Sequence, residues 1–255
     1  MTPDFLKCES HPGKLLTDHL VEVSARLDGP LLRLAGLCHD LGKASGQFQY
    51  WLDGRGPLAP ALRHHALLSA EILLEVAGGL AAVDAALAYL FVRRHHGELD
   101  NLSDALEPLR PTEEEILAKQ RARLDGAGLA RWLSRMGLQI RPCGEPARAR
   151  LRKEVIQALR ARSTRNEQMR RFQKALGDFG RLLDADRVAA SKQPAQRPFV
   201  GQEAAWSPVD LTGATPEEAR KVLRAVKMMA FASLRETHGL APASPKQYRA
   251  LRVRT

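Results

Sequence analysis

Histidine and aspartate residues recur within the first hundred residues at a spacing that suits a metal centre. Imidazole nitrogens and carboxylate oxygens bind divalent transition metals, and two such ions about 3.5–4 Å apart can activate a water and stabilise the leaving oxygen of a phosphodiester. The series therefore indicates a hydrolytic metal centre in which an aspartate can bridge two ions. Its members are His19, the pair His39-Asp40, His64 and the doublet His95-His96.

Helical periodicity surrounds these residues and strand-like alternation is scarce, so an all-α fold is expected. Consecutive residues of a helix diverge by about 100°, and both members of a pair can face one site only where the helix ends. Gly42 follows His39-Asp40 closely and Gly97 follows the doublet, and both predict such ends. A helix over about 61–76 is expected to carry His64, and further helices are expected near 112–122 and 125–136.

The remaining histidines do not join this series. His11 and His238 have no patterned neighbours, so we interpret them as structural, and we assign no role to His65. Ser69 either supports the site by hydrogen bonding or is a tolerated helix serine. The aromatic residues that follow the His-Asp pair, Phe48, Tyr50 and Trp51, either stack nucleic-acid bases or cap the core.

Composition favours a globular protein of the cytoplasm. The 255 residues are 44% apolar, which suffices for a buried core. The three cysteines, Cys8, Cys38 and Cys143, are far apart and indicate neither a disulfide framework nor a zinc finger. No secretory signal pattern opens the chain, and the apolar stretches are too short or too interrupted to cross a bilayer. We expect no membrane association.

The net charge of +10 is unevenly distributed. Acidic side chains outnumber basic ones over residues 1–100, and the positive excess lies in residues 101–255. The segment 141–175 is expected to form one or two basic amphipathic helices, which either contact a polyanion or are simply solvated. In the first case, substitution of Arg148, Arg150, Arg152 and Lys153 should weaken single-stranded DNA binding. Residues 192–206 are typical of an exposed connection, followed by a helix over about 215–237 and a basic tail.

Four segments of the chain resemble the HD superfamily of metal-dependent phosphohydrolases and, more narrowly, the HD nuclease of type I CRISPR interference. The resemblance covers residues 12–191, and its specific parts are the His-His-Gly doublet and the Lys-Ala-Ser-Gly-Gln-Phe continuation of the His-Asp pair. The segments are HDLGKASGQFQ (39–49), RHHALLSAEIL (63–73), RRHHGELDN (93–101) and LLDADRVAAS (182–191).

The resemblance implies two divalent ions, for which Mn, Fe, Co and Ni suit the ligands and Mg is possible. Asp40 would bridge the ions. Asp184 is the rival for the late carboxylate, but Asp186 holds the Ala-Asp position of the family. Lys43 would act on the scissile phosphate, or it is an ordinary helix-end lysine. The implied ligands are His19, His39, Asp40 and Asp186 for one ion, and His64, His95, His96 and Asp40 for the other.

The same resemblance implies an HD-domain helical bundle in which residues 1–191 form the nuclease domain. Residues 192–255 carry little resemblance, and we expect them to add C-terminal helices and a basic tail to the same globular unit. It implies cleavage of single-stranded DNA beside a superfamily 2 helicase recruited by the CRISPR surveillance complex. The chain has no GxxxxGK[ST] or DExD/H-type motif, so we expect a stand-alone subunit or a part of a longer nuclease-helicase. The alternatives are an HD-type nucleotide or cyclic-nucleotide phosphohydrolase and a non-enzymatic basic docking module.

Overall fold

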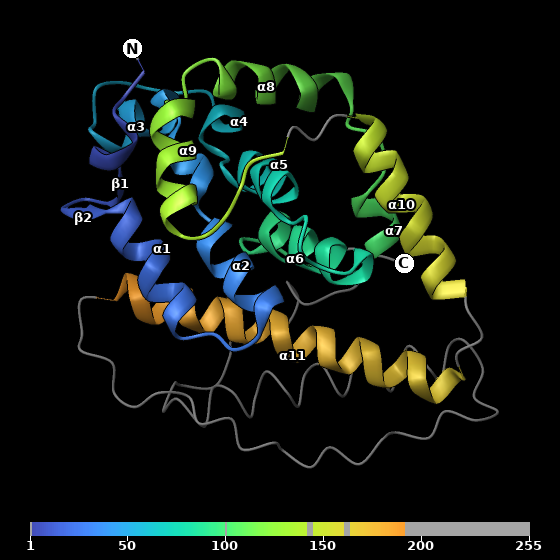
Figure 1. Ribbon diagram of the computed structural model, residues 1–255. Coiled ribbons are helices and arrows are strands. Elements are labelled where there is room, and N and C mark those ends of the chain that lie inside the picture. Colours follow the sequence, from blue (N-terminus) through green and yellow to red (C-terminus); the bar gives the residue numbers. More distant parts are fainter. Residues whose placement is uncertain (1, 100, 142–144, 161–163, 192–255) are drawn as a thin grey trace, which may run out of the picture. The chain divides into compact units, whose positions relative to one another are not determined.

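Helices make up most of the structure, a computed structural model that describes residues 2–99, 101–141, 145–160 and 164–191 (Figure 1). This confirms the all-α expectation. The strands of the described part form only a short antiparallel hairpin, in which Glu9 pairs with Leu15. The N-terminal elements are the 3-10 helix η1 (Phe5–Lys7), β1 (Glu9–His11), β2 (Lys14–Leu15) and α1 (Leu16–Ala25).

The His-Asp pair lies where one helix stops and a tighter turn starts. Gly29, at φ 78°, leads into α2 (Pro30–Cys38), whose proline occupies the first helical turn. Asp40 has φ −112° and ψ 6°, outside the α-helical range, and η2 (Leu41–Ala44) follows at once. The predicted helix end at this pair is therefore confirmed.

The expected helix over residues 61–76 is interrupted. α3 (Gly46–Leu52) leads through a loop to α4 (Pro60–Arg63), and the chain then leaves helical geometry at His64, whose ψ is 102°. α5 (Ala66–Val76) begins two residues later. α6 (Ala82–Arg94) ends at the His95-His96 doublet, as the sequence predicts.

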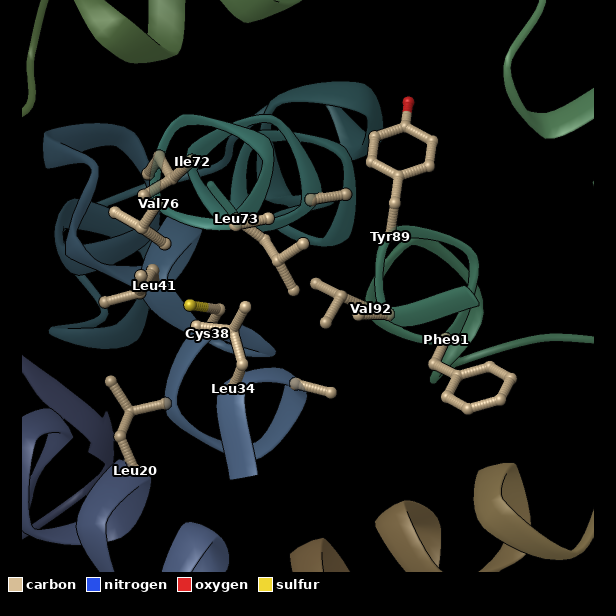
Figure 2. Close-up of a cluster of buried hydrophobic side chains, with 14 of the residues drawn as sticks. Leu20, Leu34, Cys38, Leu41, Ile72, Leu73, Val76, Tyr89, Phe91 and Val92 are labelled. Atoms are coloured by element: carbon tan, nitrogen blue, oxygen red, sulfur yellow. The ribbon is translucent and has the colours of Figure 1, made fainter. Parts of the chain in front are cut away.

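Helix α2 lies at the centre of the core, between α1 on one side and α5 and α6 on the other (Figure 2). Leu34 and Cys38 of α2 face Leu20 of α1 and the apolar side chains of α5 and α6, all of them buried. Burying side chains of this size removes a large apolar area from water, which holds the helix ends in register. The labelled side chains of α5 and α6 are Ile72, Leu73, Val76, Tyr89, Phe91 and Val92.

The later helices enclose this core. α7 (Leu102–Ala105), α8 (Pro111–Arg121) and α9 (Gly126–Arg135) follow α6, and α8 and α9 match the helices expected near 112–122 and 125–136. α10 (Glu145–Arg160) packs on α6. α11 (Arg165–Ala190) runs along α1 and α2 (Figure 1). Its C-terminal turns lie near the His-Asp pair, because Asp186 Oδ1 is 3.4 Å from His39 Nε2.

Local sequence explains where α11 begins. Thr164 accepts a hydrogen bond from the Glu167 amide at 3.3 Å, and the Glu167 carboxylate accepts one from the Thr164 amide at 2.8 Å, a capping box. Within the basic segment 141–175, residues 145–160 form α10 and residues 165–175 the first part of α11. The expectations for residues 192–255 lie outside the described residues. No helix in the described part has the length and apolarity to span a membrane.

Candidate metal centre

The carboxylate of Asp40 is almost fully buried, with 1% of the residue exposed, and imidazoles surround it on both sides. His65 Nε2 lies 2.8 Å and His95 Nε2 3.3 Å from Oδ1. His19 Nε2 lies 3.3 Å and His39 Nε2 3.5 Å from Oδ2. Each carboxylate oxygen therefore faces its own pair of imidazoles.

The first ligand set consists of His19, His39, Asp40 and Asp186, whose ligating atoms all lie within 4.8 Å of one another. The Nε2 atoms of His19 and His39 are 3.2 Å apart, and Asp186 Oδ1 lies 3.2 and 3.4 Å from them. His19 comes from the interior of α1 and Asp186 from the interior of α11. Two helices far apart in the sequence thus complete one set.

The second ligand set consists of Asp40, His65, His95 and His96, again within 4.8 Å of one another. His65 Nε2 and His96 Nε2 are 3.0 Å apart, and the rings of His95 and His96 are 3.9 Å apart between centroids. His65, His95 and Asp40 are buried, whereas His96 is exposed. The second set is therefore the more accessible side of the centre.

Backbone carbonyls orient one imidazole of each set. His39 Nδ1 lies 2.8 Å from the Gly36 carbonyl, and His95 Nδ1 lies 2.7 Å from the Val92 carbonyl. A carbonyl can only accept, so each Nδ1 carries the proton and donates it. The Nε2 atom is then left with a free lone pair, the arrangement found in histidines that bind metals.

The unsatisfied atoms of this cluster fit divalent ions. Within the described part of the chain, both Asp40 oxygens and His95 Nε2 are buried without a hydrogen-bond partner. Lys43 supplies one positive charge on the Oδ2 side, and a cation between each pair of imidazoles would satisfy the remaining lone pairs of the buried carboxylate. His39 and His95, whose Nδ1 atoms donate to carbonyls, turn the lone pairs of their Nε2 atoms toward Asp40, as in a site built for an ion. The donor set of imidazoles and carboxylates suits Mn, Fe, Co and Ni.

Protonation also favours ligation. Burial alone would raise the pKa of Asp40, but the neighbouring His39 and His65 rings and the Lys43 ammonium hold that pKa well below its usual range. Burial lowers the pKa of His65 to about 4. The carboxylate is therefore ionised and the His65 imidazole neutral near neutral pH, the states in which each can bind a metal.

Lys43 is part of the buried centre. Only 6% of the residue is exposed, and its Nζ lies 2.7 Å from Asp40 Oδ2 and donates to the Ser10 carbonyl at 3.3 Å. The alternative of an ordinary helix-end lysine does not fit this placement. The action of Lys43 on a scissile phosphate stays a prediction.

The structure places His65, and not the expected His64, in the second ligand set. His64 is exposed and takes no part in either ligand set, whereas His65 is 6% exposed and points at Asp40. The helix break at His64 turns the following residue inward. Gly42 makes this possible, because a Cβ there would lie 2.3 Å from the His65 carbonyl oxygen. The Ser69 hydroxyl accepts a hydrogen bond from the Gly42 amide at 2.8 Å, which supports the corner.

The structure also places the other candidate residues. Asp186 lies in the first ligand set, and its rival Asp184 does not. The His11 ring lies 5.5 Å from that of His19 between centroids, but His11 is in neither set. His238 falls outside the described residues.

The basic segment is less available than its composition indicates. Arg148 is 5% exposed and forms a buried ion pair with Glu71 of α5. Arg152 pairs with Glu107. Of the four cations singled out for DNA binding, these two are tied to acidic partners, while Arg150 and Lys153 are exposed.

A comparison with protein-family models matches residues 13–126 to the HD domain. This match supports the resemblance to the HD superfamily. The match contains every residue of the two ligand sets except Asp186, which α11 adds from outside the matched segment. HD domains bind divalent metals and are in general metal-dependent hydrolases of phosphate esters. No curated protein and no solved structure matched the chain.

Proposed function

We propose that this chain is a metal-dependent nuclease that hydrolyses phosphodiester bonds of single-stranded DNA in type I CRISPR interference. The observation that carries the proposal is the placement of Asp40, whose two oxygens each face a separate set of imidazoles. Two neighbouring ions are the arrangement suited to phosphodiester hydrolysis. The narrower assignment to CRISPR interference rests on the resemblance of segments 39–49, 63–73, 93–101 and 182–191.

The residues present fit two ions, one held by His19, His39, Asp40 and Asp186 and one by Asp40, His65, His95 and His96. When bound, such ions lower the pKa of a water and neutralise the charge that develops on the phosphate. The chain itself fixes the imidazoles through the Gly36 and Val92 carbonyls. The Lys43 ammonium adds a fixed positive charge beside Asp40, which favours an anionic substrate.

Direct hydrolysis needs no protein nucleophile, and the described thiols do not offer one. Burial raises the pKa of Cys8 to about 12 and also raises the pKa of Cys38. Neither side chain is in either ligand set. A covalent intermediate on these thiols is therefore disfavoured, because the thiolate is the reactive form.

The proposal includes partners. Single-stranded DNA would be supplied by a superfamily 2 helicase subunit or domain that acts with the CRISPR surveillance complex. The exposed side of the second ligand set, at His96, is the side from which a strand would reach the ions.

A substrate panel tests the proposal against its alternative, an HD-type nucleotide or cyclic-nucleotide phosphohydrolase. The full chain with Mn²⁺ is incubated with linear single-stranded DNA, mononucleotides and cyclic nucleotides, and the products are separated by chromatography. We expect shortened DNA products and no comparable turnover of small nucleotides. The isosteric variant Asp40→Asn should lose the activity while keeping its helical circular dichroism. Turnover confined to small nucleotides would replace the nuclease by its alternative.

A further inference from the structure

Helix α3 presents a large aromatic side chain to solvent directly beside a cation. Trp51 is 38% exposed, and the guanidinium carbon of Arg63 lies 5.4 Å from the centre of its ring. Arg63 ends α4, so the contact joins the two helices that flank the loop 53–59. A cation over an indole ring is a favourable pairing, and together the two groups offer an aromatic face and a positive charge.

This pair is connected to the metal centre by one buried ring. The Phe48 ring lies 5.5 Å from the Trp51 ring and 5.3 Å from the His65 ring between centroids. His65 Nε2 in turn lies 2.8 Å from Asp40. Phe48 is 5% exposed, so it belongs to the packed interior, whereas Trp51 lies on the surface. The sequence leaves open whether these aromatic residues cap the core or stack bases, and in the structure Phe48 is buried while Tyr50 and Trp51 are exposed.

The loop beside Trp51 is held in place. The Tyr50 hydroxyl donates a hydrogen bond to the Arg55 carbonyl at 2.8 Å. Gly56 has φ 154°, and a Cβ there would lie 2.9 Å from that hydroxyl, so the loop packs closely on Tyr50. A surface that is already ordered loses little conformational entropy when it binds a ligand.

We propose that Trp51, together with Arg63, is a base-stacking subsite that holds an unpaired nucleotide of the strand whose phosphate enters the metal centre. An exposed indole accepts any base on its face, and the guanidinium complements the phosphate charge. This inference rests on the proposed nuclease function and specifies how the strand is held beside the second ligand set. The subsite is selective for an unpaired base, because the bases of a duplex are already stacked on their neighbours.

Binding of a fluorescent oligothymidylate to the full chain in EDTA measures the subsite without cleavage. Trp51→Leu keeps an apolar contact for Phe48 but removes the aromatic face, and we expect it to weaken binding by about 5- to 150-fold. Trp51→Tyr should restore most of the affinity. The control Met136→Ala changes an apolar residue at the end of α9 that is 38% exposed, the same fraction as Trp51, and it should leave binding unchanged.

Oligonucleotides with one abasic position sharpen the result. At one position the missing base should weaken binding to the wild-type chain as much as Trp51→Leu does, and that position should have no effect in the variant. Wild-type affinity in Trp51→Leu, with single-stranded DNA still cleaved by the wild-type chain, would overturn the subsite alone. Absence of DNA cleavage in the substrate panel would instead overturn the nuclease on which it rests.

Discussion

Lys43 is expected to stabilise the centre chiefly when no ion is bound. Its ammonium lies 2.7 Å from Asp40 Oδ2, and the exposed fractions of the two side chains are 8% and 1%. Removing one partner of a buried ion pair costs about 3–5 kcal/mol, because the other charge stays buried without compensation. Lys43→Met, which keeps an apolar stem of similar length, should therefore lower the free energy of unfolding by about that amount in EDTA. For a domain of this size we expect Tm to fall by about 6–20 °C.

Bound ions should remove most of this difference. With saturating Mn²⁺, divalent cations neutralise the Asp40 carboxylate in either protein, and the Tm of the variant should approach that of the wild-type chain. The variant should also bind Mn²⁺ more tightly, because no ammonium competes for Oδ2. Differential scanning calorimetry with and without the metal measures the first effect, and isothermal titration calorimetry measures the second.

A matched control separates the buried pair from an ordinary one. Lys119 Nζ lies 2.7 Å from Glu115, but the exposed fractions of these side chains are 57% and 65%. Lys119→Met should change the free energy of unfolding by less than about 1 kcal/mol in either condition. If Lys43→Met lowers Tm equally with and without Mn²⁺, the ammonium does not substitute for an ion and the reasoning is refuted.

Three further predictions concern the ligands and the basic helix. His65→Ala should lose metal from the second ligand set by elemental analysis, whereas the exposed neighbour variant His64→Ala should keep it; equal metal content would contradict the placement. Burial alone would lower the pKa of His19, but the neighbouring carboxylates raise that pKa. As the pH falls, protons therefore compete with an ion at His19 before they compete at His65, whose pKa is about 4. Lowering the pH should thus empty the first set before the second, and simultaneous loss would refute this order. Arg148→Met should lower the free energy of unfolding, measured in urea, by about 3–5 kcal/mol without weakening DNA binding. Adding Glu71→Leu to that variant should restore most of the lost stability.

The sequence predicts those parts of the centre that depend on local helix ends. Gly42 and Gly97 mark the ends at which His39-Asp40 and His95-His96 turn, and both ends occur where expected. Asp186 is predicted only through the resemblance to the family pattern and not through periodicity, since nothing local shows that α11 reaches α1. The assignment of these residues as ligands stays a prediction.

The error at His64 has a tertiary cause. The apolar pattern over 61–76 is helical throughout and holds no glycine or proline at 64 or 65. The break is favoured by the approach of Gly42 to the His65 carbonyl, a contact between distant segments. Arg148 is a second example of a tertiary cause. Its charge predicts an exposed side chain, but in the fold it is buried in an ion pair with Glu71. Local patterns do not report such partners.

Cleavage of circular single-stranded DNA tests the central claim most directly. A circle has no ends, so its conversion to linear molecules reports hydrolysis of an internal phosphodiester. We predict that the wild-type chain linearises the circle in proportion to added Mn²⁺, and that EDTA or Asp40→Asn abolishes the reaction. Linearisation that persists in Asp40→Asn, or that proceeds equally in EDTA, would contradict a metal centre bridged by Asp40.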